Sequence, residues 1–241
     1  MKIRSLLSVF ALGAAAFLVY GCGAGEKSDN YLSEKEKSDG WVLLFDGSTT
    51  KGWHAYNNDN RPLTWSAQHG ELVCGPDIRY DHIDLVSDKE YKNYDVVFDW
   101  KINKGGNSGM FINVLERPDL KATWASGPEY QMLESTHPDI SDPKKLTGGI
   151  FGFVAQNTSL PPVLAGQWYH SEIRQKDGHV EFFLNGEKTY SVDLGSASWA
   201  DSVAKTHFAV QPEFGKHTSG HLALQDWQKG VAFKNIKIRE L

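Results

Sequence analysis

Cysteine is scarce in this 241-residue chain, which contains only Cys22 and Cys74. Cys22 ends an apolar N-terminal stretch, so one cysteine is left in the bulk of the chain and no disulfide can form within it. Cys74 follows two apolar residues, a setting typical of a buried and unreactive thiol. The fold must therefore be stabilised by a hydrophobic core, and the chain is long enough to build one.

Excess positive charge is also absent. The chain has 25 Lys and Arg against 30 Asp and Glu, a net charge of −5, which argues against nucleic acid as a partner. Neither a G-x-S-x-G nucleophile elbow nor a phosphate-cradling glycine loop occurs. His137 and His207 have no other histidine within five positions, whereas His217 and His221 are four positions apart. A single such pair does not by itself predict a zinc site. No cofactor is predicted with certainty, and a divalent metal stays an open option.

The N-terminus has the layout of a secretory signal. Basic residues precede an uncharged apolar run over 5–20, which is too short and too weakly flanked for a spanning helix. The segment Val19–Cys22 resembles the bacterial lipobox, in which the cysteine is lipidated and becomes the new N-terminus, although Tyr20 is bulkier than usual. We predict a signal peptide over 1–21 and a lipid on Cys22 that anchors the protein at the cell envelope, on the periplasmic face of the outer membrane or at the cell surface. An ordinary signal peptide with a chance cysteine is the alternative.

The chain changes character after the lipobox. Residues 22–39 are polar and almost free of large apolar side chains, which predicts a flexible tether. From residue 40 onward nearly every segment carries a strand pattern, with no internal repeat. We therefore expect residues 40–241 to form a single domain.

Strand signals in this domain are local and numerous. Side chains alternate through Asp95–Ile102, and the dipeptides Asp177-Gly178 and Asn185-Gly186 favour the positive φ values of two-residue hairpin turns. Further strands or hairpins are predicted at Trp41–Phe45, Thr64–Gly75, Trp168–Arg174, Phe208–Gln211, His221–Trp227 and Val231–Ile238. About a dozen short strands predict an all-β antiparallel sandwich or jelly roll. Long loops at 57–62 and 118–126 offer a binding rim.

The segment Gly127–Glu134 carries the first candidate site residues. In a regular strand Glu129 and Gln131 share one face, with large apolar side chains behind them. Such a strand lines either a binding site or simply a polar outer face. A bulge after Gln131 would return Glu134 to the face of Glu129 and pair two carboxylates, the minimum for glycoside hydrolysis.

The segment Gly105–Asn113 carries the second group. Its glycines allow a ligand to approach the backbone closely, and Asn107 can hydrogen-bond hydroxyl groups as donor and acceptor. Alternation places Asn107 on one face with Phe111 and Asn113. A plain glycine-rich turn is the alternative.

The segment Gly220–Trp227 carries the third group. Gln225 and Trp227 share one face of the expected strand. Asp226 lies on the other face beside leucines, so it is either buried and paired or part of a surface salt bridge.

Taken in order, five motifs resemble one family. They are L-F-D-G (Leu44–Gly47), N-S-G-M-F (Asn107–Phe111), G-P-E-Y-Q-M-L-E (Gly127–Glu134), G-H-L-A-L-Q-D (Gly220–Asp226) and F-K-N-I-K-I-R-E-L (Phe233–Leu241). The set resembles the 3-keto-disaccharide hydrolase family over nearly all of the domain. The resemblance implies a concanavalin A-like jelly roll that cleaves glycosides already oxidised to a ketone at the third sugar carbon.

The implied chemistry needs one base and some hydrogen-bond donors. A ketone acidifies the neighbouring C–H, so a carboxylate can abstract that proton, the leaving group is expelled and water adds back. Under this interpretation Glu129 is the base or a metal ligand. Gln131 and Asn107 orient hydroxyl groups or the ketone, and Gln225 lies close by.

One departure and two alternatives qualify this hypothesis. Trp227 stands where many members have histidine, which removes a proton carrier or metal ligand and supplies a stacking platform instead. A retaining β-glucanase of the laminarinase type would use Glu129 as nucleophile and Glu134 as acid/base, but Gln131 replaces the central aspartate of its E-x-D-x-x-E signature. The alternative from another class is a glycan-binding module without catalysis.

Overall fold

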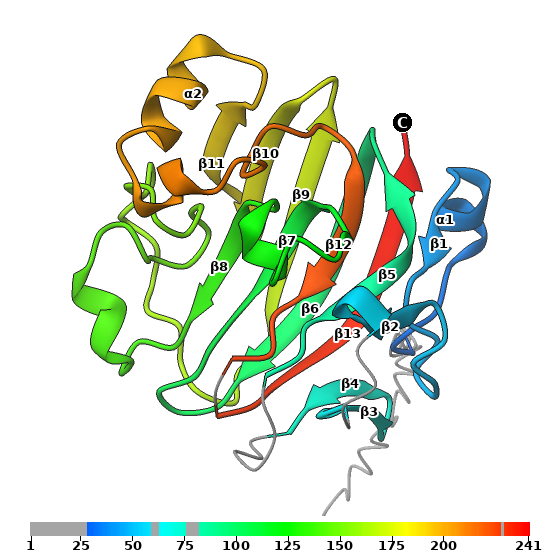
Figure 1. Cartoon of the computed structure of the whole chain (residues 1–241). Helices are drawn as coiled ribbons and strands as arrows, with labels where there is room; N and C mark the ends of the chain where they lie inside the picture. Colours follow the sequence, from blue (N-terminus) through cyan, green and yellow to red (C-terminus); the bar gives the residue numbers. More distant parts are fainter. Residues whose placement is uncertain (1–27, 59–62, 76–81, 228) are drawn as a thin grey trace, which may run out of the picture.

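The computed structural model describes residues 28–58, 63–75, 82–227 and 229–241 (Figure 1). The predicted signal peptide and Cys22 lie outside this range, as does most of the predicted rim loop 57–62. None of the helices in the described residues has the length and apolar character needed to cross a membrane.

Two antiparallel sheets stack face to face, so the predicted all-β sandwich is confirmed (Figure 1). The larger sheet runs β11 (Glu187–Asp193), β10 (His179–Leu184), β9 (Tyr169–Lys176), β6 (Tyr94–Ile102), β13 (Val231–Glu240), β4 (Glu71–Cys74) and β3 (Trp65–Gln68), with β1 (Val42–Leu43) also paired to β13. The smaller sheet runs β2 (Trp53–Ala55), β5 (Leu85–Tyr91), β12 (Gly220–Leu224), β7 (Asn107–Val114) and β8 (Glu129–Leu133). Short helical elements connect them: α1 (Glu34–Ser38), η1 (Tyr56–Asn58), η2 (Thr123–Ala125), η3 (Pro138–Ser141), α2 (Ala197–Val203) and η4 (His207–Val210).

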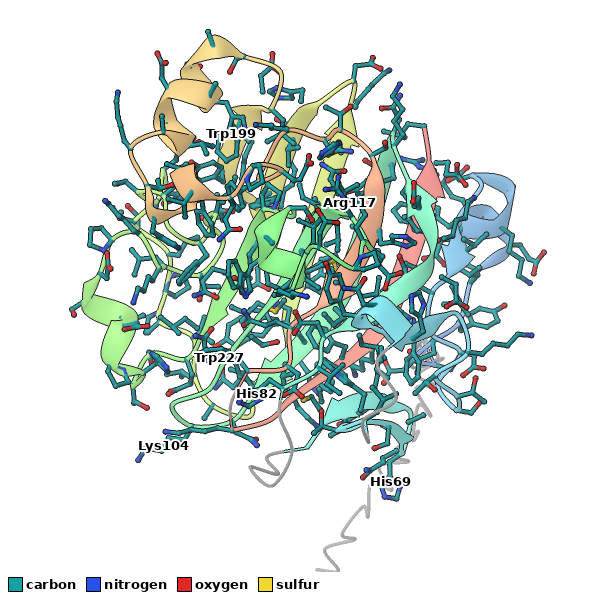
Figure 2. The ribbon with its side chains drawn as sticks, in the orientation of Figure 1. His69, His82, Lys104, Arg117, Trp199 and Trp227 are labelled. Atoms are coloured by element: carbon teal, nitrogen blue, oxygen red, sulfur yellow. The ribbon has the colours of Figure 1, made fainter. Side chains whose placement is uncertain are left out.

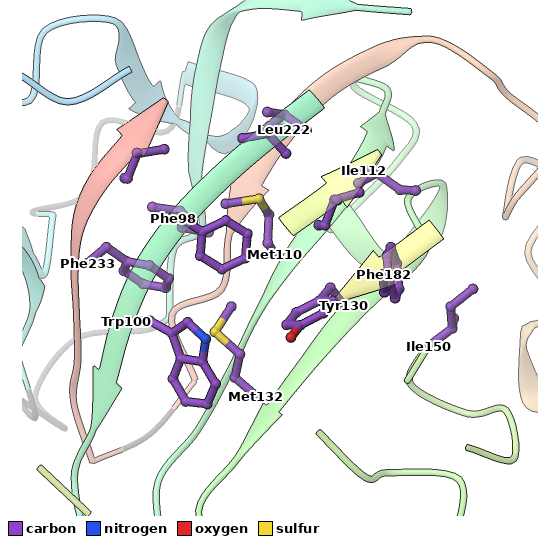
Figure 3. Packing of buried hydrophobic residues seen from close by; sticks show 14 of the residues in the cluster. Phe98, Trp100, Met110, Ile112, Tyr130, Met132, Ile150, Phe182, Leu222 and Phe233 are labelled. Carbon is purple, nitrogen blue, oxygen red and sulfur yellow. The ribbon is translucent and has the colours of Figure 1, made fainter. Parts of the chain in front are cut away.

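The core lies between the sheets and consists of the inward side chain at every second strand position (Figure 3). Phe98 on β6 meets Tyr130 on β8 edge to face, with ring centroids 5.9 Å apart. The buried hydroxyl of Ser171 contacts Tyr130 Oη at 2.8 Å and accepts a hydrogen bond from Trp100 Nε1 at 2.9 Å. The polar atoms of these large aromatics are thus satisfied inside an apolar layer.

The hairpins predicted from turn dipeptides are confirmed. Asp177 and Gly178 have φ values of 51° and 84°, and Asn185 and Gly186 have 50° and 83°. These turns join β9 to β10 and β10 to β11, which pair antiparallel. Local turn chemistry therefore fixes one end of the larger sheet.

The strand predicted at Phe208–Gln211 is wrong, because the chain forms the 3-10 helix η4 there. The hydroxyl of Thr206 accepts a hydrogen bond from the Phe208 amide and caps that helix. The Phe208 ring stacks on Phe214 at 3.8 Å, so its apolar character reflects a side cluster and not a sheet face. The strand predicted at Trp41–Phe45 is shortened to the two residues of β1.

The segment predicted as a flexible tether is ordered where it is described, from residue 28. Ser33 and Glu36 form a capping box at the start of α1. Lys237 on β13 donates to Glu36 Oε1 at 2.6 Å, and Asn30 exchanges two hydrogen bonds with Asn235 at 2.6 and 2.8 Å. Polar side chains thus attach residues 28–39 to the domain, which a composition argument alone does not anticipate.

Candidate active site

The outer face of the smaller sheet carries the candidate site. On β8, Tyr130 and Met132 point into the core, so Glu129 and Gln131 face outward, as alternation predicts. On β7, Phe111 pairs with Glu129 and lies in a separate apolar cluster on this outer face. The sequence-predicted face of Glu129 and Gln131 is therefore the face of a potential site.

Gly109 on β7 leaves the space that the Glu129 carboxyl occupies. A Cβ atom at residue 109 would lie 2.1 Å from Glu129 Oε1, far inside contact distance. The carbonyl of Gly109 also accepts a hydrogen bond from the Gln225 amide at 2.9 Å, which continues the β7–β12 pairing past the end of β12. Because residue 109 has no side chain, its backbone forms the floor of the site beside the side chains of Glu129 and Gln225.

A cavity of about 340 Å³, here called the Glu129 cavity, opens over this floor. Five of the six catalytic and binding residues predicted from the sequence line it together: Asn107, Glu129, Gln131, Gln225 and Trp227. Its other lining residues are Trp124, Asp139, Lys145, Phe151, His207 and Phe208. The volume and the mixture of aromatic and polar walls suit one small polar ligand.

Four buried polar atoms of this lining have no hydrogen-bond partner among the residues that the structure describes. They are Asn107 Oδ1, Glu129 Oε1, Gln131 Nε2 and Gln225 Oε1. Burying such a group without a partner costs about 1–3 kcal/mol, and native proteins avoid it elsewhere. The set offers both acceptors and donors, which matches hydroxyl groups, because each hydroxyl also donates and accepts.

The geometry of Gln131 fixes which end of its amide faces the cavity. Its Oε1 accepts a hydrogen bond from the Met132 amide at 3.0 Å. Its Nε2 is then left without an acceptor among the described residues, in the lining of the cavity. A donor held in this way can stabilise negative charge on an oxygen atom of the substrate.

Glu129 is a buried carboxyl without a cationic partner. Its side chain is 5% exposed, and no ion pair reaches it among the described residues. Burial raises the pKa of Glu129 well above the usual range, and the negative charge of Asp84 raises it further. A carboxyl in this state is a strong base once ionised, as a proton-abstracting residue must be.

A second cavity of about 490 Å³, here called the Asp84 cavity, adjoins the first. The two share Trp124, Gln225 and Trp227, so they form neighbouring compartments of one cleft. The remaining walls come from η1, from the loop before β5 and from residues 118–122, within the loop predicted as a rim.

Asp84 is a second carboxyl that sequence reasoning missed. Its Oδ1 accepts a hydrogen bond from the Asp226 amide at 2.9 Å, and its Oδ2 accepts one from the Thr123 hydroxyl. Burial raises the pKa of Asp84 to about 6, although the Thr123 bond opposes the shift. The one sequence signal was its position, an aspartate directly before the apolar start of β5.

Asp226 is buried and paired, one of the two settings considered for it. Its carboxyl accepts hydrogen bonds from the Ile83 amide at 3.2 Å, from Thr64 Oγ1 and from Cys74 Sγ at 3.2 Å. His82 Nδ1 lies 3.1 Å away. Burial and the charge of Asp226 raise the pKa of Cys74, so this thiol is inert, as predicted. Asp226 thus holds the loop that carries Asp84.

Glu134 does not join Glu129. β7 and β8 pair without a register shift, so the bulge after Gln131 that would have paired the two carboxylates is absent. Glu134 follows the end of β8, about 16 Å along the chain from Glu129 at 3.3 Å per residue. Burial would raise the pKa of Glu134, but hydrogen bonds from Thr136 and from the Gly105 amide outweigh it and lower that pKa. Its carboxylate therefore caps a turn.

Asn113 also lies on a different face from the one predicted. A bulge at residue 113, where φ is 55°, shifts the register between β7 and β12. The Asn113 side chain turns inward and exchanges two hydrogen bonds with Gln175 on β9, at 2.7 and 3.0 Å. It belongs to the core and not to the site.

Two tryptophans stand at the junction of the cavities. Trp124 and Trp227 are each 44% exposed, unusually high for such large apolar side chains. Figure 2 shows Trp227 beside His82, and their ring centroids are 5.6 Å apart. Exposed, supported indole faces suit stacking against the apolar face of a sugar ring.

The described residues contain no group of three or more His, Cys, Asp or Glu side chains arranged to hold a metal ion. No described residue is therefore assigned as a metal ligand.

Comparison with known proteins places the chain among carbohydrate-active proteins. Residues 40–239 match the family described as the 3-keto-alpha-glucoside-1,2-lyase-like domain. The chain is similar to a 3-keto-disaccharide hydrolase of Bacteroides thetaiotaomicron, with 27% identity over 233 residues, 85% of this chain and 79% of that protein.

Solved structures give the same grouping. A candidate glycosyl hydrolase from Parabacteroides distasonis is 34% identical with a TM-score of 0.80, and the match covers 89% of this chain and 100% of that one. A second from the same organism is 25% identical with a TM-score of 0.61, covering 83% and 99%. A Bacillus subtilis protein with a galectin-like fold, 12% identical with a TM-score of 0.51, shares the fold alone.

Proposed function

The chain belongs to the 3-keto-alpha-glucoside-1,2-lyase-like family, and from this premise we propose that it cleaves 3-keto-glycosides, 3-keto-disaccharides among them. A glycoside-cleaving enzyme that acts on carbohydrate is supported by relatives named as hydrolases. The ketone on the substrate and the roles of individual residues are proposed here from the geometry of the site.

The observation that carries the proposal is the set of unpartnered polar atoms in the Glu129 cavity. Acceptors on Asn107, Gln225 and Glu129 and a donor on Gln131 surround one space of about 340 Å³. A sugar ring with several hydroxyl groups and a ketone satisfies these atoms, whereas an apolar ligand leaves them unpaired at a cost of about 1–3 kcal/mol each.

Glu129 is the proposed base. In its ionised form it takes the proton from the carbon next to the ketone, and the electron pair of that C–H bond forms an enolate. The enolate then expels the glycosidic oxygen with the electron pair of the C–O bond. Water adds to the resulting double bond, and the proton returns from Glu129 to carbon, so the net change is hydrolysis.

Gln131 and Asn107 are the proposed positioning residues. The Nε2 donor of Gln131 faces the site and stabilises the enolate oxygen, because developing negative charge strengthens that hydrogen bond. Asn107 Oδ1 and Gln225 Oε1 accept hydrogen bonds from ring hydroxyls and orient the ring.

Product analysis with matched substrates tests the proposal. The purified protein and its Glu129→Gln variant are incubated with a 3-keto-disaccharide and with the unoxidised disaccharide, each with and without a chelator. Cleavage of the keto sugar only, lost in the variant, is the expected result. Cleavage of the unoxidised sugar would overturn the keto requirement, and loss of activity with chelator would add a metal.

The other functions considered have less support from the geometry. A laminarinase-type glucanase needs Glu129 and Glu134 on one face, and the unshifted β7–β8 register separates them. A glycan-binding module accounts for the tryptophans but not for a buried, unpaired carboxyl. Binding of both sugars without turnover of either is the result that would favour the module.

Location at the cell envelope completes the proposal. It rests on the signal-like segment 1–21 and on Cys22 in the lipobox-like Val19–Cys22. Labelling with a radioactive fatty acid tests it: the chain should take up label, and Cys22→Ala should abolish the uptake.

A further inference from the structure

Asp84 lies in a row of residues that crosses the smaller sheet to Gly109, and the carboxyl of Glu129 lies over Gly109. Leu85 pairs with Leu224 on β12, and Leu224 pairs with Met110 on β7. Because the strands are antiparallel, the row beside these pairs consists of Asp84 before Leu85, Gln225 after Leu224 and Gly109 before Met110. In this row the Gln225 amide donates a hydrogen bond to the Gly109 carbonyl.

The side chains of this row lie on the outer face. Leu85 belongs to the core, whereas Val86 belongs to the outer apolar cluster with Phe111 and Ala223. Alternation then places Asp84 on the outer face with Val86, and it lines the Asp84 cavity. The carboxyl of Glu129 lies over Gly109 on that same face.

The two carboxyls lie near each other on one sheet face. The Cα atoms of Asp84 and Gly109, over which the Glu129 carboxyl lies, are two strand spacings apart, about 10 Å. Gln225, with its unpartnered Oε1, occupies the strand between them and belongs to both cavities.

We propose that the Asp84 cavity binds the sugar that leaves, and that Asp84 is a second catalytic residue, which protonates the glycosidic oxygen as its bond to the keto sugar breaks. This inference rests on the proposed function, in which the keto sugar occupies the Glu129 cavity. The shared Trp124 and Trp227 then flank the two rings at the linkage.

The proton balance closes without any further reactant. During elimination Glu129 gains a proton from carbon, and Asp84 gives its proton to the departing oxygen. During hydration the ionised Asp84 takes a proton from the water whose oxygen bonds to the anomeric carbon, and Glu129 returns its proton to the neighbouring carbon. Both carboxyls end as they began, and one water has been consumed.

The local contacts of Asp84 suit this exchange. The Thr123 hydroxyl and the Asp226 amide hold its two oxygens, while burial keeps its pKa near the neutral range, at about 6. The charge of Asp84 also acts on Glu129, so the two carboxyls are coupled.

Leaving-group dependence tests the proposal. Asp84→Asn is compared with the wild type and Glu129→Gln on two substrates, a 3-keto-disaccharide and a 4-nitrophenyl 3-keto-glucoside, whose nitrophenolate leaves without being protonated. We expect Asp84→Asn to lower kcat on the disaccharide by about 10²–10³-fold, in the range of general acid–base catalysis, and by less than about 10-fold on the nitrophenyl substrate. Asp201→Asn, at an exposed aspartate of α2, is the control and should leave both rates unchanged.

A second variant keeps the test informative if Asp84→Asn unfolds. Thr123→Val removes a hydrogen bond that lowers the pKa of Asp84, so the limb of the pH–rate profile that belongs to Asp84 should move to higher pH. An equal loss of kcat on both substrates, or no loss on the disaccharide, would overturn the role of Asp84 but leave the proposed function standing. A wild type that cleaves neither keto substrate would overturn the proposed function and this inference with it.

Discussion

Two buried carboxyl groups on opposite faces of the sandwich differ in their partners. Asp95 on the larger sheet is 2% exposed, and Glu129 on the smaller sheet is 5% exposed. Asp95 accepts hydrogen bonds from Arg174 Nε at 2.8 Å and from Arg239 Nη2. Within the described part of the chain, Glu129 has neither a cation beside it nor a hydrogen-bond donor at Oε1.

The difference separates stabilising from functional polar groups. A buried carboxylate with guanidinium partners is compensated and supports the fold. A buried carboxyl without partners costs stability, and such a cost persists at sites where the group acts on a ligand. Four buried polar atoms without hydrogen-bond partners among the described residues line one cavity on the outer face of the smaller sheet. This face is therefore the candidate functional face.

The largest expected effect comes from removing the unpaired carboxyl. Glu129→Gln should lower kcat on a 3-keto-disaccharide by about 10³-fold or more, because general base catalysis contributes about 10²–10⁴-fold. Steady-state kinetics measures it. A variant with more than a tenth of wild-type activity would contradict the role of Glu129 as base.

Gly109→Ala should have the next largest effect. The new Cβ would lie 2.1 Å from Glu129 Oε1, so the carboxyl must move, and a misplacement near 1 Å costs about 100-fold in rate. Gly75→Ala is the matched control, since its nearest neighbour lies at 3.7 Å. If the two alanine variants have equal kcat, the close fit of Glu129 over Gly109 is not required.

Asp95→Asn tests whether the paired carboxyl on the larger sheet acts on stability and not on activity. Loss of the charge-assisted bonds to Arg174 and Arg239 should lower the free energy of unfolding by about 2 kcal/mol. Asp119→Asn, in an exposed and solvent-screened pair with Arg117, should lower the free energy of unfolding much less than Asp95→Asn does. Urea denaturation measures both, and kcat of the folded variants should match the wild type. If Asp95→Asn lost activity but kept its stability, the larger sheet and not the smaller one would carry a functional carboxyl.

The pH dependence of stability should also differ between the faces. Because the pKa of Glu129 is raised on folding, the folded state favours its protonated form, and stability falls as pH rises from about 4.5 through the raised pKa. The loss is complete at high pH, where the carboxyl is ionised in both the folded and the unfolded chain. Glu129→Gln should therefore match the wild type near pH 4 and exceed its stability at pH 8 in denaturant titrations. A constant difference across this range would contradict a raised pKa.

The smallest expected effect concerns the junction of the cavities. Trp227→Ala should raise KM for the disaccharide by about 10-fold with little change in kcat, since loss of stacking removes about 1 kcal/mol or more of binding. Val210→Ala, at another exposed apolar residue, is the control. Equal KM values would remove Trp227 from the site.

Much of the fold follows from local sequence signals. Strand alternation put Glu129 and Gln131 on one outward face, and the dipeptides at 177–178 and 185–186 fixed two hairpins. These features depend on residues adjacent in the chain. The failures at Phe208–Gln211 and Asn113 arose where distant packing decided the conformation, through Phe214 and Gln175.

The candidate site was predictable only in part, for the same reason. Asn107, Glu129 and Gln225 stand in recognisable motifs, and the sheet register brings them into one cavity. Asp84 carries no motif and reaches the cleft through pairing with β12, some 140 positions along the chain. Glu134 does not line the cavity, because its pairing with Glu129 required a bulge after residue 131 that does not form.

Hydrolysis in heavy water tests the central account most directly. The 3-keto-disaccharide is cleaved in D₂O, and the keto sugar is quenched early and analysed by mass spectrometry and NMR, with spontaneous exchange measured in the absence of enzyme. Proton abstraction by Glu129, with exchange of that proton for solvent deuterium before it returns to carbon, predicts deuterium at the carbon next to the ketone in the wild-type product, and neither exchange nor product with Glu129→Gln. Product without deuterium, combined with an unchanged rate for a substrate that carries deuterium at that carbon, would contradict the account and indicate direct displacement at the anomeric carbon.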